Sequence, residues 1–259
     1  MAPARYLKLG LLLLALVAAG AAAWFTLGRQ PEERLPPLGL FTSLPIYWSE
    51  AADISAMLSS DAEPHWARRL IERRRDLQPL DVLTPQALAP FTDILIAQPR
   101  ALGAAENVAL DGWVRGGGHV LLFADPLLTQ HSQFGLGDRR RPMGVALLSP
   151  ILTHWGLALT MDDAEPEGER QVQLLGGALP VDQTGRFILM PTQPDAPAAC
   201  HLLAKGLAAE CRIGAGHALI VADAALLDHA GHGDAGGGTA QPIREAALSR
   251  LLEAAFTHH

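Results

Sequence analysis

Cysteine and aromatic residues are scarce in this sequence, and acidic residues outnumber basic ones. Of 259 residues only 2 are Cys, and the aromatic residues are 5 Trp, 2 Tyr and 7 Phe. Two cysteines are too few for a disulfide-rich scaffold, and by themselves they do not complete a metal site. With 20 Lys and Arg against 27 Asp and Glu, the formal net charge of −7 argues against a protein that binds nucleic acid non-specifically.

Charge is also absent from the 20-residue run at 9–28, LGLLLLALVAAGAAAWFTLG. An apolar run of this length can cross a bilayer as one helix, and the preceding Arg5 and Lys8 predict a cytoplasmic N-terminus. We therefore expect residues 1–28 to be a single transmembrane anchor in a bacterial inner membrane, with the remaining chain in the periplasm. The three alanines at 21–23 leave open a signal peptide that is cleaved, which would release the protein into the periplasm.

The segment after the apolar run divides into a linker and one large domain. Residues 29–37, RQPEERLPP, are polar and proline-rich, which predicts a short, stiff linker. Residues 38–259 are then expected to form one extracytoplasmic α/β domain. Within it, the buried-strand patterns DILIAQP (93–99) and HVLLFADP (119–126) alternate with helical patterns at 65–77 and 104–115. Such alternation predicts a mostly parallel sheet between helices.

The second half of the domain has a different pattern. A helix is expected with Pro142 in its first turn and Gly156 at its end. Between 171 and 223 several short strand patterns are separated by turns, as in QVQLL, FILMP and HALIVAD. This spacing predicts an antiparallel C-terminal elaboration of the parallel sheet.

Three consecutive glycines, Gly116 to Gly118, raise the question of a phosphate-binding loop. Phosphate-binding glycines lie between a strand and the helix that follows it, and a P-loop also needs Lys and Ser or Thr after its second glycine. Here the glycines follow a helix and precede a strand. The order therefore predicts a helix C-cap and a chain reversal.

Two stretches, LDGWVRGGGHVLLFADP (110–126) and IGAGHALIVADAALLDH (213–229), resemble the extracytoplasmic domain of gliding-motility-type and uncharacterised ABC-transport-system proteins. The resemblance implies a flavodoxin-like, class I glutamine-amidotransferase-like fold. Enzymes similar to that fold carry a nucleophilic Cys just after the strand that follows the glycines. This chain has Ala124, Asp125 and Pro126 there, and both cysteines lie far downstream.

The resemblance therefore implies a non-enzymatic accessory protein of an ABC-type transport or envelope assembly system, with no catalytic residue and no cofactor. Such a protein would bind a membrane-protein partner, for instance an ABC transporter subunit. The alternative is a periplasmic hydrolase or small-ligand-binding domain that uses Asp125 and Asp223, because open α/β sheets present functional groups at strand ends. Each aspartate could equally cap a following helix or turn.

The two cysteines are candidates for a disulfide. If Lys205 and Gly206 form a two-residue hairpin turn, the register places Cys200 directly opposite Cys211, within bridging distance. Two buried thiols in a tight hairpin are the other possibility.

Two further groups of residues are candidates for contact with a partner. The arginines Arg68, Arg69 and Arg73 on the first helix, and Arg139 and Arg140 later, suit anionic lipid or an acidic partner, or form a solvated face.

The aromatic pair Tyr47 and Trp48 suits an exposed contact patch, or packs over the edge of the sheet.

The loop DHAGHGD (228–234) holds residue types that bind zinc, but its glycines make the loop costly to order, so we expect no metal site.

Overall fold

The structure, a computed structural model, describes residues 34–50, 63–161, 165–191, 198–227 and 237–257. The predicted anchor at 1–28 lies outside these residues, as do the zinc-type ligands of 228–234. No helix among the described residues combines the length and the apolar character needed to span a membrane. The compact unit that carries the fold runs from Pro36 to His259.

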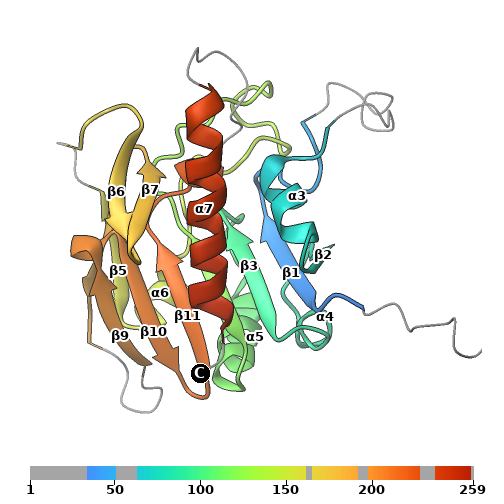
Figure 1. The fold of residues 1–259 in the computed structure, drawn as a ribbon. Helices are drawn as coiled ribbons and strands as arrows, with labels where there is room; N and C mark the ends of the chain where they lie inside the picture. Colours follow the sequence, from blue (N-terminus) through green and yellow to red (C-terminus); the bar gives the residue numbers. More distant parts are fainter. Residues whose placement is uncertain (1–33, 51–62, 162–164, 192–197, 228–236, 258–259) are drawn as a thin grey trace, which may run out of the picture. The chain divides into compact units, whose positions relative to one another are not determined.

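A seven-stranded mixed sheet forms the centre of this unit (Figure 1). Its order in the described residues is β2-β1-β3-β4-β11-β10-β9. The strands are β1 (Pro37–Thr42), β2 (Asp76–Pro79), β3 (Asp93–Ala97), β4 (His119–Phe123), β9 (Ala198–Leu203), β10 (Ala208–Ile213) and β11 (Gly216–Val221). From β2 to β11 neighbouring strands run parallel, whereas β10 and β9 run antiparallel at one edge.

Two short antiparallel pairs lie beside the main sheet. They are β5 (Leu157–Met161) with β8 (Gly185–Leu189), and β6 (Arg170–Leu174) with β7 (Gly177–Val181). The helices are α3 (Trp66–Glu72), α4 (Pro85–Leu88), α5 (Ala104–Arg115), α6 (Ser149–His154) and α7 (Gly237–Phe256), with one-turn helices η1 (Ala204–Gly206) and η2 (Ala225–Leu227).

Alternation along the buried strands divides the core into two layers. In β3, Leu95 and Ala97 join the cluster that includes α3 and α7, while Ile94 and Ile96 join the cluster that includes α4, α5 and α6. Successive side chains of a strand point to opposite faces, so a strand covered on both sides is apolar throughout. In Figure 1, α7 crosses one face of the sheet and α5 lies on the other.

The three glycines end α5 as predicted. Gly116 is the C-cap and Gly117 has a φ of +112°, a conformation that favours glycine. A Cβ at Gly118 would lie 2.4 Å from the Trp113 ring. These residues turn the chain from α5 into β4, so the helix-cap interpretation is confirmed.

The predicted fold class needs correction. We expected the C-terminal strands to form an antiparallel elaboration of a parallel sheet. Instead, β11 pairs parallel with β4 in the middle of the main sheet, and β10 and β9 extend the same sheet. The flavodoxin-like, amidotransferase-like assignment is therefore replaced by an α/β domain with a mixed sheet.

The predicted helix from Pro142 was also wrong in its start. α6 begins only at Ser149, and residues 142–148 are not helical.

Candidate functional site

The carboxyl ends of the parallel strands meet at one edge of the sheet. β1, β3, β4 and β11 end there at Thr42, Ala97, Phe123 and Val221. Ligands of open α/β sheets bind beyond this edge. Two regions of the edge carry carboxyl groups, a buried aspartate pair after β4 and β11 and an open pocket after β1 and β2.

The buried aspartate pair consists of Asp125 and Asp223, each 1% exposed. The Asp125 carboxylate accepts hydrogen bonds from the backbone N–H of Leu127 (2.8 Å) and of Ala224 (3.0 Å). The Asp223 carboxylate accepts from the backbone N–H of Ala225 (2.8 Å) and of Asp182 (2.9 Å). All four carboxylate oxygens therefore have a backbone donor, which is the geometry of the capping alternative, and they tie three loops together.

Burial also makes both carboxyl groups costly to ionise. Desolvation raises the pKa of Asp125 to about 6, aided by the charge of Asp182 and opposed by the N–H groups of Leu127 and Ala224. Desolvation likewise raises the pKa of Asp223 well above its usual range, and the charge of Asp125 adds to this. Two neighbouring buried carboxyl groups resist being ionised together.

Gln98, a residue that sequence reasoning missed, connects this pair to β1. Its side chain is fully buried, donates to the carbonyls of Asp125 (3.0 Å) and Met143 (2.8 Å), and accepts from the Asp125 N–H. Its own carbonyl accepts a hydrogen bond from the Ser43 hydroxyl, which in turn accepts from the Met143 N–H. The only available signal was a polar residue directly after a buried strand, and it did not reveal these partners.

An open pocket of about 280 Å³ lies after β1 and β2. It is lined by residues 42–45, 47–50 and 79–81 together with Leu40, Phe134 and Arg140. The predicted contact residues Tyr47 and Trp48 belong to this lining, and so does the predicted Arg140. We call it the strand-end pocket. Asp125 and Asp223 do not line it.

Two carboxyl groups line the strand-end pocket. One oxygen of Glu50 accepts a hydrogen bond from the Gln133 N–H at 2.9 Å, while its other oxygen, Oε1, is buried without a hydrogen-bond partner among the described residues. Asp81 follows β2 by two residues and is exposed. A buried carboxylate oxygen without a donor is costly, so a ligand's N–H or O–H that reached it would remove this cost.

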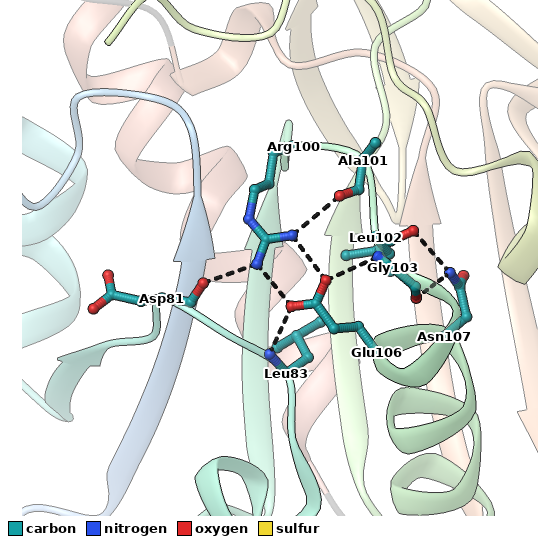
Figure 2. A network of polar contacts seen from close by, with 8 residues as sticks. All are labelled: Asp81, Leu83, Arg100, Ala101, Leu102, Gly103, Glu106 and Asn107. Carbon is teal, nitrogen blue, oxygen red and sulfur yellow. Dashed lines mark hydrogen bonds and ion pairs between the residues drawn. The ribbon is translucent and has the colours of Figure 1, made fainter. Parts of the chain in front are cut away.

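A polar network holds Asp81 in place (Figure 2). Arg100 donates to both carboxylate oxygens of Glu106 (2.7 and 2.8 Å) and to the carbonyl of Asp81 (3.0 Å). Glu106 also accepts from the N–H groups of Leu83 and Gly103, and these four bonds lower its pKa to about 2. The Asp81 carboxylate points away from Arg100 in Figure 2, and the bond that Asp81 makes to Arg100 is through its backbone carbonyl.

The aromatic wall of the pocket already contacts guanidinium groups. Arg68 lies over the Tyr47 ring and Arg140 over the Phe134 ring, each at 4.1 Å from the ring centre. Trp48 meets Tyr47 edge to face at 4.9 Å and is 64% exposed.

The other predicted arginines lie on the surface, mostly beside carboxylates. Arg69 pairs with Glu63 at 3.3 Å and Arg73 approaches Glu245 at 3.9 Å, while Arg139 is exposed. Exposed pairs of this kind add little stability. Their contact with lipid or an acidic partner stays a prediction, as does a membrane-protein partner.

The cysteines are bonded to each other in the structure. Cys200 on β9 is the register partner of Cys211 on β10, and their sulfur atoms form a disulfide between the two edge strands. Among the described residues no group of three or more His, Cys, Asp or Glu side chains could hold a metal ion.

No protein-family model matches this sequence, and no curated protein matches it either. Several solved structures are similar in part. The exo-β-1,4-mannosidase Op5Man5 from Opitutaceae bacterium strain TAV5 has a TM-score of 0.48 and 16% identity, over 86% of this chain and 36% of the mannosidase. The GH42 β-galactosidase Gan42B has a TM-score of 0.48 and 11% identity, over 85% of this chain and 30% of the galactosidase.

A smaller protein, the cytoplasmic protein STM1381 from Salmonella typhimurium LT2, also has a TM-score of 0.48 and 11% identity, over 85% of this chain and 99% of its own. This chain thus spans about a third of the length of the glycosidases and almost all of STM1381. At these identities and TM-scores the likenesses assign no activity.

The comparisons nevertheless correct several predictions. The similar structures named here are glycosidases and a protein called cytoplasmic, so the identification with amidotransferase-like domains of ABC-transport-system proteins is withdrawn. The prediction of a non-enzymatic protein was drawn from that identification and is withdrawn with it. The placement in an inner membrane with a periplasmic domain is withdrawn as well; among the described residues no helix has the length and apolar character to span a membrane.

Proposed function

We propose that this protein is a hydrolase or small-ligand-binding domain whose ligand occupies the strand-end pocket. The observation that carries the proposal is Glu50, which lines a pocket of about 280 Å³ and whose buried oxygen Oε1 has no hydrogen-bond partner in the described part of the chain. The pocket lies at the carboxyl edge of the sheet, where α/β domains bind ligands. Its mixture of aromatic walls and a few polar groups suits a small polar molecule.

The aspartate pair supports the site from outside the pocket. Asp125 and Asp223 accept four backbone N–H groups, and at 1% exposure each they offer a ligand almost no surface. Through Gln98 and Ser43 their hydrogen bonds continue to the segment that lines the pocket. In this proposal the strand-end aspartate that meets the ligand is Asp81.

Binding is tested by thermal shift across a panel of small amines, amino acids, sugars and carboxylic acids, followed by calorimetry on the compounds that raise the melting temperature. A ligand that binds the folded state alone stabilises it, so at least one compound should do so. Glu50→Gln keeps the shape and an acceptor for Gln133 but removes the charge, and it should abolish the shift. Glu167→Gln is the matched control, because Glu167 is exposed and lies outside the pocket. A panel without a hit, or equal shifts in both variants, would contradict the proposal.

Hydrolysis is tested on the same site, because Glu50 and Asp81 are two carboxyl groups beside one cavity. Hydrolysis of glycosides commonly uses such a pair as general acid and as base or nucleophile. Chromogenic glycosides and esters should therefore be turned over by the wild-type protein, and Asp81→Asn should reduce turnover at least a hundredfold. Turnover that survives in both Glu50→Gln and Asp81→Asn would exclude this chemistry.

A further inference from the structure

We infer that the ligand of the strand-end pocket carries a positive charge, as an ammonium or guanidinium group on a short chain. The inference rests on the proposed function, since it concerns the same pocket, and it adds the chemical class of the ligand. It is built from the aromatic wall and from the balance of charges around the pocket.

The aromatic wall already binds two cations that belong to the chain. Arg68 covers the Tyr47 ring and Arg140 covers the Phe134 ring at the same distance of 4.1 Å. Cations are attracted to the face of an aromatic ring, and tryptophan is the strongest of the three ring types. Trp48, 64% exposed beside Tyr47, therefore offers a ligand the kind of surface that its neighbours offer to arginines.

The charges of the pocket favour a cation as well. Among the described residues, Glu50 and Asp81 contribute two carboxylates to the lining, whereas its one cation, Arg140, is already paired with Asp138 through two hydrogen bonds of 2.8 and 3.1 Å. Because Asp138 offsets the charge of Arg140, the lining keeps an excess of negative charge. An anion would be repelled by these carboxylates, and a neutral ligand would gain no charge attraction from them.

Glu50 supplies a specific contact for that cation. Its Oε1 is buried and has no hydrogen-bond partner in the part of the chain that the structure describes, so an N–H donor from the ligand that reached it would satisfy an acceptor that the fold leaves open. Hydrogen bonds between a charged donor and a carboxylate are about twice as strong as neutral ones. The volume of about 280 Å³ admits a group of a few heavy atoms and part of its chain.

The experiment titrates the full chain with n-propylguanidinium and with its neutral isostere n-propylurea, followed by NMR chemical shifts or calorimetry. The two probes have the same size and planar head and differ in charge. We expect the guanidinium to bind at least tenfold more tightly, with an affinity that falls as salt is raised. Glu50→Gln should weaken guanidinium binding at least fivefold, and the control Glu167→Gln should leave it unchanged.

A second pair of variants tests the ring. Trp48→Leu should weaken guanidinium binding severalfold while Trp48→Phe restores most of it, because Phe keeps an aromatic face. Equal binding of the two probes, or a panel that yields only neutral or anionic ligands in the pocket, would overturn the charge inference and leave the proposed function standing. Absence of binding by both probes and by every compound of the panel would overturn both.

Discussion

The two carboxyl-bearing regions of the sheet edge differ in whether their hydrogen bonds are complete. The aspartate pair after β4 and β11 is almost fully buried, and each of its four oxygens accepts a backbone N–H. The strand-end pocket after β1 and β2 is open, and Glu50 Oε1 in its lining has no partner. Position at the edge of a sheet is therefore not enough to identify a ligand site, because a saturated carboxylate stabilises the fold and an unsatisfied one is available for binding.

The largest effect is expected from the buried aspartate pair, as a dependence of stability on pH. The pKa of Asp125 is raised to about 6 in the folded protein against an ordinary 3.8, so the folded state binds more protons between these values. Stability should fall as pH rises from about 4 to about 6, by up to about 3 kcal/mol, and change little from this cause above. Urea unfolding across this range measures it.

Asp125→Asn is the variant that isolates this effect, and its stability should decline less over the same pH range. The control Glu167→Gln should follow the wild-type curve. A decline of equal slope in Asp125→Asn would show that another group, such as Asp223, titrates instead.

Removing the other buried carboxylate should have the next largest effect. Asp223→Ala leaves the N–H groups of Ala225 and Asp182 without their acceptor, and a buried unsatisfied donor costs about 1–3 kcal/mol. The variant also avoids the cost of burying the Asp223 carboxyl group, which offsets part of this loss. We therefore expect a net loss of about 2 kcal/mol in the free energy of unfolding at pH 7. Ligand binding in the strand-end pocket should change little. A variant as stable as the wild type would contradict the structural role of Asp223.

The network of Figure 2 should show an intermediate effect. Glu106→Gln turns two of four accepted hydrogen bonds into clashes between donors, and we expect a loss of about 1–2 kcal/mol at pH 7. Because the pKa of Glu106 is lowered to about 2, its contribution is present above about pH 4.5 and is lost as pH falls toward 2.

The difference between Glu106→Gln and wild type should therefore shrink in acid, which thermal unfolding at pH 3 and pH 7 can check. The variant should also weaken ligand binding, since Arg100 and Glu106 hold the segment that carries Asp81. A difference that stays constant from pH 7 to pH 3 would argue against a role for the Glu106 charge.

The smallest effect on stability is expected at the pocket itself. Glu50→Gln should change the free energy of unfolding by less than about 0.5 kcal/mol, because Gln can still accept from the Gln133 N–H. Its effect on binding should be among the largest. A pocket variant that unfolds as readily as Asp223→Ala would remove the distinction between the two regions.

The sequence pattern correctly predicted those elements that depend only on residues close to one another in the chain. The apolar runs at 93–97 and 119–123 form the predicted buried strands. The glycines after Arg115 end α5, where Gly117 has a positive φ. The short turn between β9 and β10 sets the register that pairs Cys200 with Cys211. The prediction of a helix from Pro142 was wrong. The Met143 N–H donates to the Ser43 hydroxyl and the Met143 carbonyl accepts from the Gln98 side chain, so neither group makes a helical hydrogen bond.

By itself the sequence determined the alternation of apolar strands and amphipathic helices, and with it an α/β domain, because periodicity depends only on nearby residues. Tertiary structure alone decided that β11 lies beside β4, that Asp125 and Asp223 meet backbone donors, and that Glu50 keeps an unpartnered oxygen. These outcomes depend on contacts between segments up to about a hundred residues apart, where hydrogen bonding and burial are set by the packing of the whole sheet edge.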